Sequence, residues 1–269
     1  MQLSLREHIV PSIRTLPISS TVKLALLSIS PLKPELVTVS LPMGLKAYVP
    51  TKWLTHVWSN ILHIFYHRDY EGVVEVIPRD GWKVMDVGSF IGLWTLRAAK
   101  LVGAKGRVIA LEPNPLCYRL TRANVMLNSL DNVVVLNYAL DSEARERRLY
   151  IAPNIGNSSF VKRYVDDMGG CVGSMEVETI TLDDIFDKLD VKALDLVKID
   201  VEGYEDELLY TICQYMAKGI VKRVVIEVHR NVVDEDKVVD ALEKAGCKVY
   251  LYDVGLEVQT FVYALRTEP

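Results

Sequence analysis

Cysteines, long apolar runs and a secretion signal are scarce or absent in this 269-residue sequence. The four cysteines stand 34 to 54 positions apart with no Cys-x-x-Cys pair, which excludes a zinc signature and a dense disulfide framework. No apolar run approaches the roughly 20 residues of a membrane-spanning helix, and the first 17 residues lack the apolar core of a secretory signal. We therefore expect reduced, buried thiols and a cytoplasmic protein without a membrane span. The cysteines are Cys117, Cys171, Cys213 and Cys247.

The chain as a whole also lacks a strong charge of either sign. It has 31 Lys and Arg residues against 35 Asp and Glu, a formal charge of −4. Residues 1–70 hold seven of the basic residues and three of the acidic ones, together with His8, His56, His63 and His67. A basic segment on an acidic body can contact an anionic partner, although such an excess is more often a solvated surface. Half of the residues are hydrophobic, which excludes a disordered chain and allows a sizeable core.

The pattern of expected elements changes near residue 80 and divides the chain into an N-terminal extension, 1–78, and a larger domain, 79–269. In the extension we expect a short helix, a second helix over 19–30 with a serine cap, and two strands around the Pro-Met-Gly turn of 37–50. An amphipathic helix over 51–67 follows, and its apolar side chains are expected to pack in the core. These side chains are Trp53, Val57, Ile61, Ile64 and Phe65.

After residue 80, short β-rich segments alternate with helical ones. Such alternation predicts an α/β fold, with a parallel sheet and helices on both faces. The last two strands are joined by a few residues around Gly255, too few for a crossover, so they are expected to pair antiparallel. Residues 141–194 are too many for a plain crossover and should carry additional elements. The predicted strands are 82–88, 106–113, 132–140, 193–201, 222–229, 247–254 and 259–266, and the predicted helices are 92–100, 115–128, 205–219 and 234–246.

A glycine turn and two carboxylates mark the ends of the first two strands of the domain. The first strand ends in Asp86-Val-Gly88-Ser-Phe-Ile-Gly92 and the second in Glu112. Ligands of open parallel sheets bind at such ends, where glycines let the backbone approach closely. A dinucleotide site has the spacing G-x-G-x-x-G, and the acidic turn would oppose its phosphates. S-adenosylmethionine (SAM) is a cation without phosphate, so the turn favours SAM over NAD, with Glu112 accepting hydrogen bonds from the ribose hydroxyls.

Eight motifs in order make the chain similar to a known family. They are DVGSFIG (86–92), ALEPNP (110–115), LN (127–128), NVVVLNYAL (132–140), the Ser-Ser pair of GNSSF (156–160), TLDD (181–184), KIDVEGYE (198–205) and IEVH (226–229). Through them, residues 70–265 resemble the FkbM family of class I SAM-dependent methyltransferases. The resemblance implies a Rossmann-like sheet of six parallel strands and one antiparallel strand, and methyl transfer from SAM, usually to a hydroxyl oxygen. Ser89 and Phe90 depart from the Ala and Asn usual in that family.

The resemblance also implies which residues bind the cofactor. It places the glycine turn of 86–92 around the aminoacid end of SAM, Glu112 and Asn114 at the ribose, and the end of the third strand, 137–140, beside the adenine. The residues assigned to SAM in this way are Asp86, Gly88, Ser89, Gly92, Glu112, Asn114 and Ala139.

Three residues beside the expected position of the methyl group are candidates for catalysis. Asp200 and Glu202 lie two apart at the end of the fourth strand, so their side chains point to one side. An alcohol acceptor gains from a base within reach of its proton, and His229 ends the adjacent strand with the side chain whose pKa best suits this task. His229 is equally well explained as a structural histidine bonded to a carboxylate. The catalytic candidates are therefore Asp200, Glu202 and His229, with no metal ligand assigned.

The same strand ends leave two alternatives open. A divalent metal would find oxygen and imidazole ligands here and would lower the pKa of an acceptor hydroxyl. Its ligands would be Asp200, Glu202, Glu227 and His229. The second alternative is methylation of a ribose 2′-hydroxyl in RNA, where a lysine and carboxylates surround the hydroxyl, and Lys198 favours it. Lys198 stands in an apolar strand, however, and is equally explained as a side chain that extends its ammonium to solvent at a sheet edge.

The sequence predicts a SAM-dependent O-methyltransferase that acts on a hydroxyl of a small molecule, a glycan or a glycolipid precursor. The extension would cover the acceptor side of the sheet or form the interface of a homodimer. Two other functions stay open: ribose 2′-O-methylation of RNA, which the basic N-terminal segment favours, and SAM binding without catalysis. The fourth strand end lacks the Asn/Asp-Pro-Pro-Tyr or Phe sequence of amino-nitrogen methylation and the cysteine of carbon-5 pyrimidine methylation.

Overall fold

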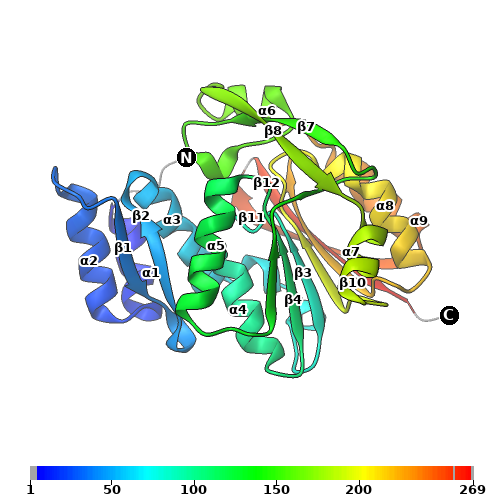
Figure 1. The fold of residues 1–269 in the computed structure, drawn as a ribbon, viewed down its shortest axis with the longest axis horizontal. Coiled ribbons are helices and arrows are strands. Elements are labelled where there is room, and N and C mark those ends of the chain that lie inside the picture. The colour runs from blue at the N-terminus through cyan, green and yellow to red at the C-terminus, as the bar shows by residue number, and fades with distance from the viewer. Residues whose placement is uncertain (1–4, 257, 268–269) are drawn as a thin grey trace.

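The computed structural model describes residues 5–256 and 258–267, which are built around a seven-stranded sheet (Figure 1). The strand order is β11-β12-β10-β9-β3-β4-β5. β12 runs antiparallel to its two neighbours, β10 and β11, and the other pairs are parallel. The predicted sheet of six parallel strands and one antiparallel strand is therefore confirmed. Its strands are β3 (Lys83–Val87), β4 (Arg107–Leu111), β5 (Val133–Leu136), β9 (Leu196–Ile199), β10 (Arg223–His229), β11 (Cys247–Leu256) and β12 (Gln259–Arg266).

Helices cover both faces of this sheet, because successive residues of its inner strands are apolar. In β3, Val84 joins a buried cluster with α4, whereas Met85 joins a second cluster with α7 and α8 on the opposite face. Helices α4 and α5 thus lie on one face and α7, α8 and α9 on the other (Figure 1). The helices are α4 (Leu93–Val102), α5 (Pro115–Leu127), α7 (Leu182–Leu189), α8 (Glu205–Ala217) and α9 (Glu235–Lys244).

The predicted third strand, 132–140, is wrong as one continuous element. β5 ends at Leu136, and β6 (Ala139–Leu140) joins a separate three-stranded sheet in the order β6-β8-β7. The break follows from Asn137, whose side chain donates hydrogen bonds of 2.8 and 2.9 Å to the carbonyls of Glu112 and Pro113 and so turns the chain out of the main sheet. The additional elements expected within 141–194 are present. They are β7 (Glu146–Ile151), α6 (Lys162–Asp167), β8 (Gly173–Ile180) and the helix α7.

The N-terminal extension forms two helices, a hairpin and a third helix before β3. The hairpin predicted for 37–50 is confirmed, with β1 and β2 pairing antiparallel. The helix predicted over 51–67 contains α3 with helical turns at both ends. The serine cap expected for the second helix is wrong, because α2 begins after Pro17 and has no side-chain cap. The elements are α1 (Leu5–Thr15), α2 (Ile18–Ile29), β1 (Leu36–Ser40), β2 (Lys46–Pro50) and α3 (Leu54–Leu62).

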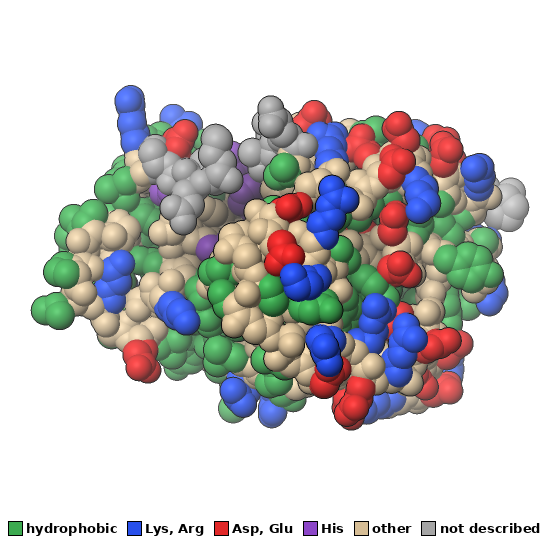
Figure 2. Space-filling view, turned by 90° about the horizontal axis from the view of Figure 1, so that it is seen from above, with side chains coloured by type: hydrophobic (Ala, Val, Ile, Leu, Met, Phe, Trp, Pro, Cys, Tyr) green, Lys and Arg blue, Asp and Glu red, His purple; other side chains and the backbone are tan. Residues whose placement is uncertain are grey.

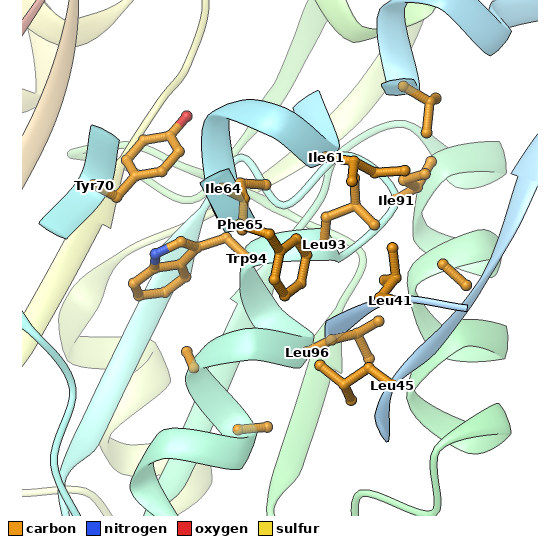
Figure 3. Close-up of a cluster of buried hydrophobic side chains, with 14 of the residues drawn as sticks. Leu41, Leu45, Ile61, Ile64, Phe65, Tyr70, Ile91, Leu93, Trp94 and Leu96 are labelled. Atoms are coloured by element: carbon orange, nitrogen blue, oxygen red, sulfur yellow. The ribbon is translucent and has the colours of Figure 1, made fainter. Parts of the chain in front are cut away.

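The extension shares one hydrophobic core with the helix α4. Figure 3 shows Leu45 from the hairpin and Ile61 from α3 gathered with Leu96 of α4. A buried ion pair crosses the same boundary, with Arg97 Nε of α4 lying 2.6 Å from Glu71 Oε1. The extension is therefore packed onto the sheet rather than linked to it by a flexible segment.

The surface of the extension differs from that of the rest of the molecule. Four apolar side chains of α2 that share one face are 50% to 71% exposed: Ile18, Val22, Leu26 and Ile29. Figure 2 shows hydrophobic side chains gathered at this end and acidic side chains mainly over the other. No helix within the described residues is long and apolar enough to cross a bilayer. All four cysteines are free, two buried and two half-buried.

Candidate active site

A cavity opens at the carboxyl ends of β3, β4 and β9, the end of the sheet where ligands of open parallel sheets bind. Its empty volume is about 950 Å³ including the open mouth. Seven of the ten predicted site residues line this cavity, whereas Asp86, Gly92 and His229 do not. The seven are Gly88, Ser89, Glu112, Asn114, Ala139, Asp200 and Glu202.

The loop between β3 and α4 approaches β9 so closely that only glycine fits. Gly88 has a φ of +80°, and a Cβ built there would lie 1.8 Å from the carbonyl oxygen of Asp200. Gly92, with a φ of +83°, ends the loop at the start of α4, where a Cβ would lie 2.8 Å from Thr121. Both positions need a left-handed backbone that glycine adopts without strain. The loop therefore brings its backbone to the edge of the cavity.

Asp86 and Lys198 form a buried ion pair beneath this loop. The Lys198 ammonium lies 3.2 Å from Asp86 Oδ1 and 3.2 Å from Asp200 Oδ2. It also donates a hydrogen bond of 2.9 Å to the carbonyl of Gly88, and Thr95 donates one of 2.6 Å to Asp86 Oδ2. Burial opposes the charge of Lys198, but Asp200 and Asp86 hold its pKa above the usual value. Asp86 thus fixes the loop through its partners instead of facing the cavity.

The interpretation of Lys198 as a residue that snorkels at a sheet edge is wrong. β9 lies inside the sheet, between β10 and β3. Lys198 is accordingly only 3% exposed, and its ammonium is held by two carboxylates instead of by solvent. An apolar strand tolerates a lysine here because two negative partners lie beside it, Asp86 fully buried and Asp200 half-buried.

Glu112, at the end of β4, presents a buried carboxylate to the cavity. Its Oε2 accepts a hydrogen bond of 2.8 Å from the N–H of Phe90, and its Oε1 accepts one of 2.9 Å from the N–H of Asn114. Burial raises the pKa of Glu112 to about 8, although these two hydrogen bonds oppose the shift. Asn114 in turn caps α5, because its side chain accepts from the N–H of Leu116. The backbone around Glu112 therefore fixes the direction of its free lone pairs.

Polar atoms beside Glu112 fit a nucleoside ligand such as SAM. The Ser89 hydroxyl and the side-chain amide nitrogen of Asn114 are buried and make no hydrogen bond within the described part of the chain, and both residues line the cavity. Buried polar atoms are nearly always paired, so these two indicate a missing partner. A ribose offers acceptors to them and hydroxyl donors to Glu112. Tyr138 and Ala139 line the adjoining wall and give an apolar surface for a base.

Tyr70 joins two carboxylates at the other end of the cavity. Its hydroxyl lies 2.9 Å from Asp200 Oδ2 and 2.5 Å from Glu227 Oε2. Gln259 donates to the other oxygen of Glu227 at 2.7 Å. The sequence did not single out Tyr70, which lines the cavity from the extension, and its only signal was the aromatic composition of residues 65–70.

Glu202 lines the cavity next to Asp200 and has a strained backbone, with a φ of +57°. The hydroxyl of Tyr164, a second residue missed in the sequence, donates to its carboxylate. Burial raises the pKa of Glu202 to about 8, and the negative charge of Asp200 adds to this shift while His229 opposes it. Strained residues persist where the surrounding structure holds them, often at functional sites.

His229 lies behind Glu202 and is 2% exposed. Its Nδ1 is 2.9 Å from Glu205 Oε1, and its Nε2 is 3.5 Å from Glu202 Oε2 and 4.0 Å from Glu227 Oε1. Although burial opposes the charge, Glu205 and these neighbours raise the pKa of His229 well above its usual value. Of the four residues considered as metal ligands in the sequence, Asp200, Glu227 and His229 bring ligand atoms within 4.8 Å of one another.

The extension and the segment 141–194 supply the remaining wall. His56 lines the cavity from α3, and its ring contacts Phe90 edge-on at 5.4 Å between centroids. Burial lowers the pKa of His56 to about 4, so its imidazole is neutral. Gly156 leaves room for it, because a Cβ there would lie 2.5 Å from His56 Nε2. Ser158 and Ser159, from the motif GNSSF, also line the cavity.

The chain matches the model of the methyltransferase FkbM domain over residues 86–249. It is 29% identical over 170 residues to the methyltransferase sdnD of Sordaria araneosa, covering 54% of this chain and 65% of that protein. It is 30% identical over 185 residues to the hexuronic acid methyltransferase AglP of Haloferax volcanii, covering 66% of this chain and 71% of that protein. The chain thus aligns with about two thirds of the length of each relative.

A solved structure supports the fold. The METTL16 methyltransferase domain aligns with a TM-score of 0.53 and 14% identity, covering 92% of this chain and 78% of that chain. The family match begins at Asp86, in β3 just before the loop that frames the cavity, and ends in β11, so it includes Glu112, Asp200 and His229. The chain belongs to the FkbM family of class I SAM-dependent methyltransferases, and SAM is its cofactor.

Proposed function

We propose that the protein transfers the methyl group of SAM to a hydroxyl oxygen of a sugar-like acceptor in a small molecule, a glycan or a glycolipid precursor. The observation that carries this proposal is the carboxylate pair of Asp200 and Glu202 at one end of the cavity. Both side chains accept hydrogen bonds from a neutral hydroxyl, whereas the negative charge of Asp200 disfavours a carboxylate or phosphate group as the group that is methylated. The relative AglP, named as a hexuronic acid methyltransferase, supports an acceptor with a sugar ring.

We assign the other end of the cavity to SAM. Glu112 accepts hydrogen bonds from the ribose hydroxyls, and the free polar atoms of Ser89 and Asn114 bind beside it. Ala139 packs against the adenine. Gly88 brings the loop backbone to the aminoacid end. Asp86 and Gly92 act indirectly, because they hold this loop in its shape and do not line the cavity.

SAM, when bound, supplies a methyl group on a sulfonium that is already activated for displacement. The task of the chain is to hold the acceptor oxygen in line and to accept its proton. Glu202 is the base in this proposal, because its carboxylate lines the cavity and is held by Tyr164 and His229. Asp200 accepts a second hydrogen bond from the acceptor. His229 positions Glu202, since it does not line the cavity and its Nε2 lies 3.5 Å from Glu202 Oε2.

The extension covers the acceptor in this proposal. His56, Asn60 and Ile64 line the cavity from the α3 segment, so residues 1–78 supply part of the acceptor wall. A wall on this side of the cavity suits a compact polyol better than a long RNA strand. The predicted homodimer stays a prediction, and the exposed apolar face of α2 is the surface that sedimentation of wild-type protein and a Leu26→Lys variant would test.

Incubation with methyl-labelled SAM tests the proposed reaction. The panel contains hexoses, hexuronic acids, nucleotide sugars, extracted glycolipids and RNA. We expect label in a sugar-bearing fraction, in a bond that survives mild alkali, because a methyl ether is stable where a methyl ester is hydrolysed. Label in RNA would support the ribose 2′-O alternative instead, and alkali-labile label would contradict a hydroxyl acceptor. SAM binding without transfer to any fraction would favour a protein that binds SAM only.

Substitution of Glu202 tests its role in the same assay. We expect Glu202→Gln to lower kcat by about 10²–10⁴-fold, the usual contribution of a general base. SAM affinity should change little, because the ribose and adenine contacts remain. Glu207→Gln is the matched control, since Glu207 is exposed on the same segment of the chain. Equal turnover of the two variants would remove Glu202 from the mechanism.

A further inference from the structure

Three side chains at the ends of two neighbouring strands converge on one point. Asp200 follows β9, whereas Glu227 and His229 lie two apart at the end of β10, so both of these side chains leave the same face of the strand. One ligand atom of each residue lies within 4.8 Å of the others. Glu227 and His229 are 8% and 2% exposed, and Asp200 is the member that borders the cavity. The point of convergence is therefore buried on one side and open to the cavity on the other.

Two ligand atoms in this cluster are unused. His229 Nε2 is buried and makes no hydrogen bond within the described residues, and it is aimed between Glu202 and Glu227, at 3.5 and 4.0 Å. Asp200 Oδ1 is likewise buried and unpaired, while Oδ2 is held by Tyr70. Orphaned buried atoms of this kind indicate a partner that the protein itself does not supply. Both a nitrogen and an oxygen ligand are thus free to bind a cation.

The surroundings hold these ligands in the way that metal sites do. The other nitrogen of His229, Nδ1, lies 2.9 Å from Glu205 Oε1, which fixes the ring and leaves Nε2 for a ligand. A carboxylate behind a metal-binding histidine is the usual outer partner in such sites. Tyr70 and Gln259 hold the two oxygens of Glu227 at 2.5 and 2.7 Å. The site is therefore formed before any ion binds.

The charge balance also calls for a cation. Four carboxylates surround this point, those of Asp200, Glu202, Glu205 and Glu227. The ammonium of Lys198 pairs with Asp200 and also with Asp86. His63, which is paired with Asp69, also faces Asp200 and Glu227 from the extension. Buried carboxylates are paired with a positive charge, neutralised by a proton or bound to a metal, and a cation at this point would supply the pairing.

We propose that Asp200, Glu227 and His229 bind one divalent transition-metal ion at the acceptor end of the cavity. One imidazole and two carboxylates suit Mn²⁺ or Zn²⁺ better than Ca²⁺. The ion takes the place of a proton on His229 Nε2 and leaves its open positions toward the cavity, where Asp200 lies. Resting on the proposed function, the site narrows the acceptor to one with two neighbouring hydroxyls, which bind the ion together. The ion lowers the pKa of the hydroxyl to be methylated, which then gives its proton to Glu202 more readily.

Binding of Mn²⁺ alone to the full chain tests the site, without SAM or acceptor. Electron paramagnetic resonance counts free Mn²⁺ during a titration, and we expect one ion bound per chain. His229→Gln and Glu227→Gln should weaken binding more than tenfold, and Glu205→Gln by about 10–100-fold, as outer partners of metal ligands do. Asp240→Asn is the matched control, because its carboxylate is 66% exposed on α9 and lies outside the cluster. SAM titration of each variant confirms that it is folded.

The outcomes separate this site from the proposed reaction. An absence of bound Mn²⁺ throughout the titration would overturn the metal site. Equal binding by wild type and by a His229→Gln variant that binds SAM would also overturn it. Binding that follows the variants as expected supports it, even if no hydroxyl is methylated, in which case the proposed reaction alone fails. Methyl transfer that persists unchanged in a chelator, by a protein that binds no Mn²⁺, leaves the reaction standing and rejects the metal.

Discussion

Glu112 is a carboxylate whose charge the surrounding protein opposes. Burial raises its pKa to about 8 in the folded chain, whereas an unfolded glutamate has a pKa of about 4.3. Between these two values the folded protein holds a proton that the unfolded chain releases, so the stability of the fold decreases as the pH rises through this window. Ionised Glu112 lowers the stability of the fold, so its presence indicates a ligand that binds to the negative carboxylate.

Glu112→Gln removes this ionisation. We expect the melting temperature of the variant, relative to wild type, to increase from pH 5 to pH 8 and to level off above it, in a calorimetric scan. The substitution also removes one carboxylate oxygen that accepts a backbone hydrogen bond, and this lowers the melting temperature equally at every pH. The change of the melting-temperature difference with pH therefore reports the charge of Glu112 alone. SAM affinity should fall at least tenfold, because a charge-assisted hydrogen bond to the ribose is lost. A difference in melting temperature that does not vary with pH would contradict the raised pKa.

Single residues were predictable from the sequence where they stand directly at strand ends. Gly88, Glu112 and Asp200 lie in the last residues of predicted strands, and all three line the cavity. Tyr70 and His56 were missed because they reach the cavity from the extension, and no periodic pattern reveals which elements pack across a sheet end. The same reason applies to the ion pair of Asp86 with Lys198, which depends on the register of β3 against β9.

The loop between β3 and α4 is the element on which both ends of the cavity depend. Gly88→Ala should displace it, because the new Cβ would lie 1.8 Å from the Asp200 carbonyl. Gly81→Ala is a matched control with a φ of +81° and no atom within 4 Å of its Cβ. The control should lose only about 1–2 kcal/mol for its left-handed backbone and keep SAM affinity. Gly88→Ala should bind SAM at least 100-fold more weakly in titration calorimetry. Similar SAM affinity in both variants would show that the close approach is unimportant.

At the scale of elements, hydrophobic patterning predicted most of the structure. Strands buried on both faces and helices with one apolar face leave clear patterns in the sequence. Both ends of every sheet strand except the third were predicted to within three residues. That strand was drawn too long because apolar residues continue past the turn at Asn137, whose side-chain hydrogen bonds are not visible in a hydrophobic pattern. The start of α2 was misjudged for a similar reason, since Pro17 begins the helix without a side-chain cap.

At the scale of the whole molecule, the extension and the sheet share a core and one buried ion pair. Arg97→Ala leaves Glu71 buried with only the half-exposed Arg68 as a partner. Breaking a buried pair in this way costs about 3–5 kcal/mol. We expect a single calorimetric transition in wild type, shifted down by at least about 6 °C in the variant.

An exposed ion pair is the control for this experiment. Arg148 and Glu176 lie 2.9 Å apart with side chains 62% and 50% exposed, so Arg148→Ala should hardly shift the transition. Two separate transitions in wild type would mean that the extension folds independently of the sheet. Equal shifts for Arg97→Ala and Arg148→Ala would mean that the buried pair does not couple them.

The central claim is that Glu112 and the β3–α4 loop form the SAM site, and a crystal structure with S-adenosylhomocysteine tests it most directly. The account predicts both ribose hydroxyls within hydrogen-bond distance of Glu112, the adenine against Ala139 and the sulfur pointing toward Asp200 and Glu202. Density for the nucleoside at any position away from Glu112 would contradict it.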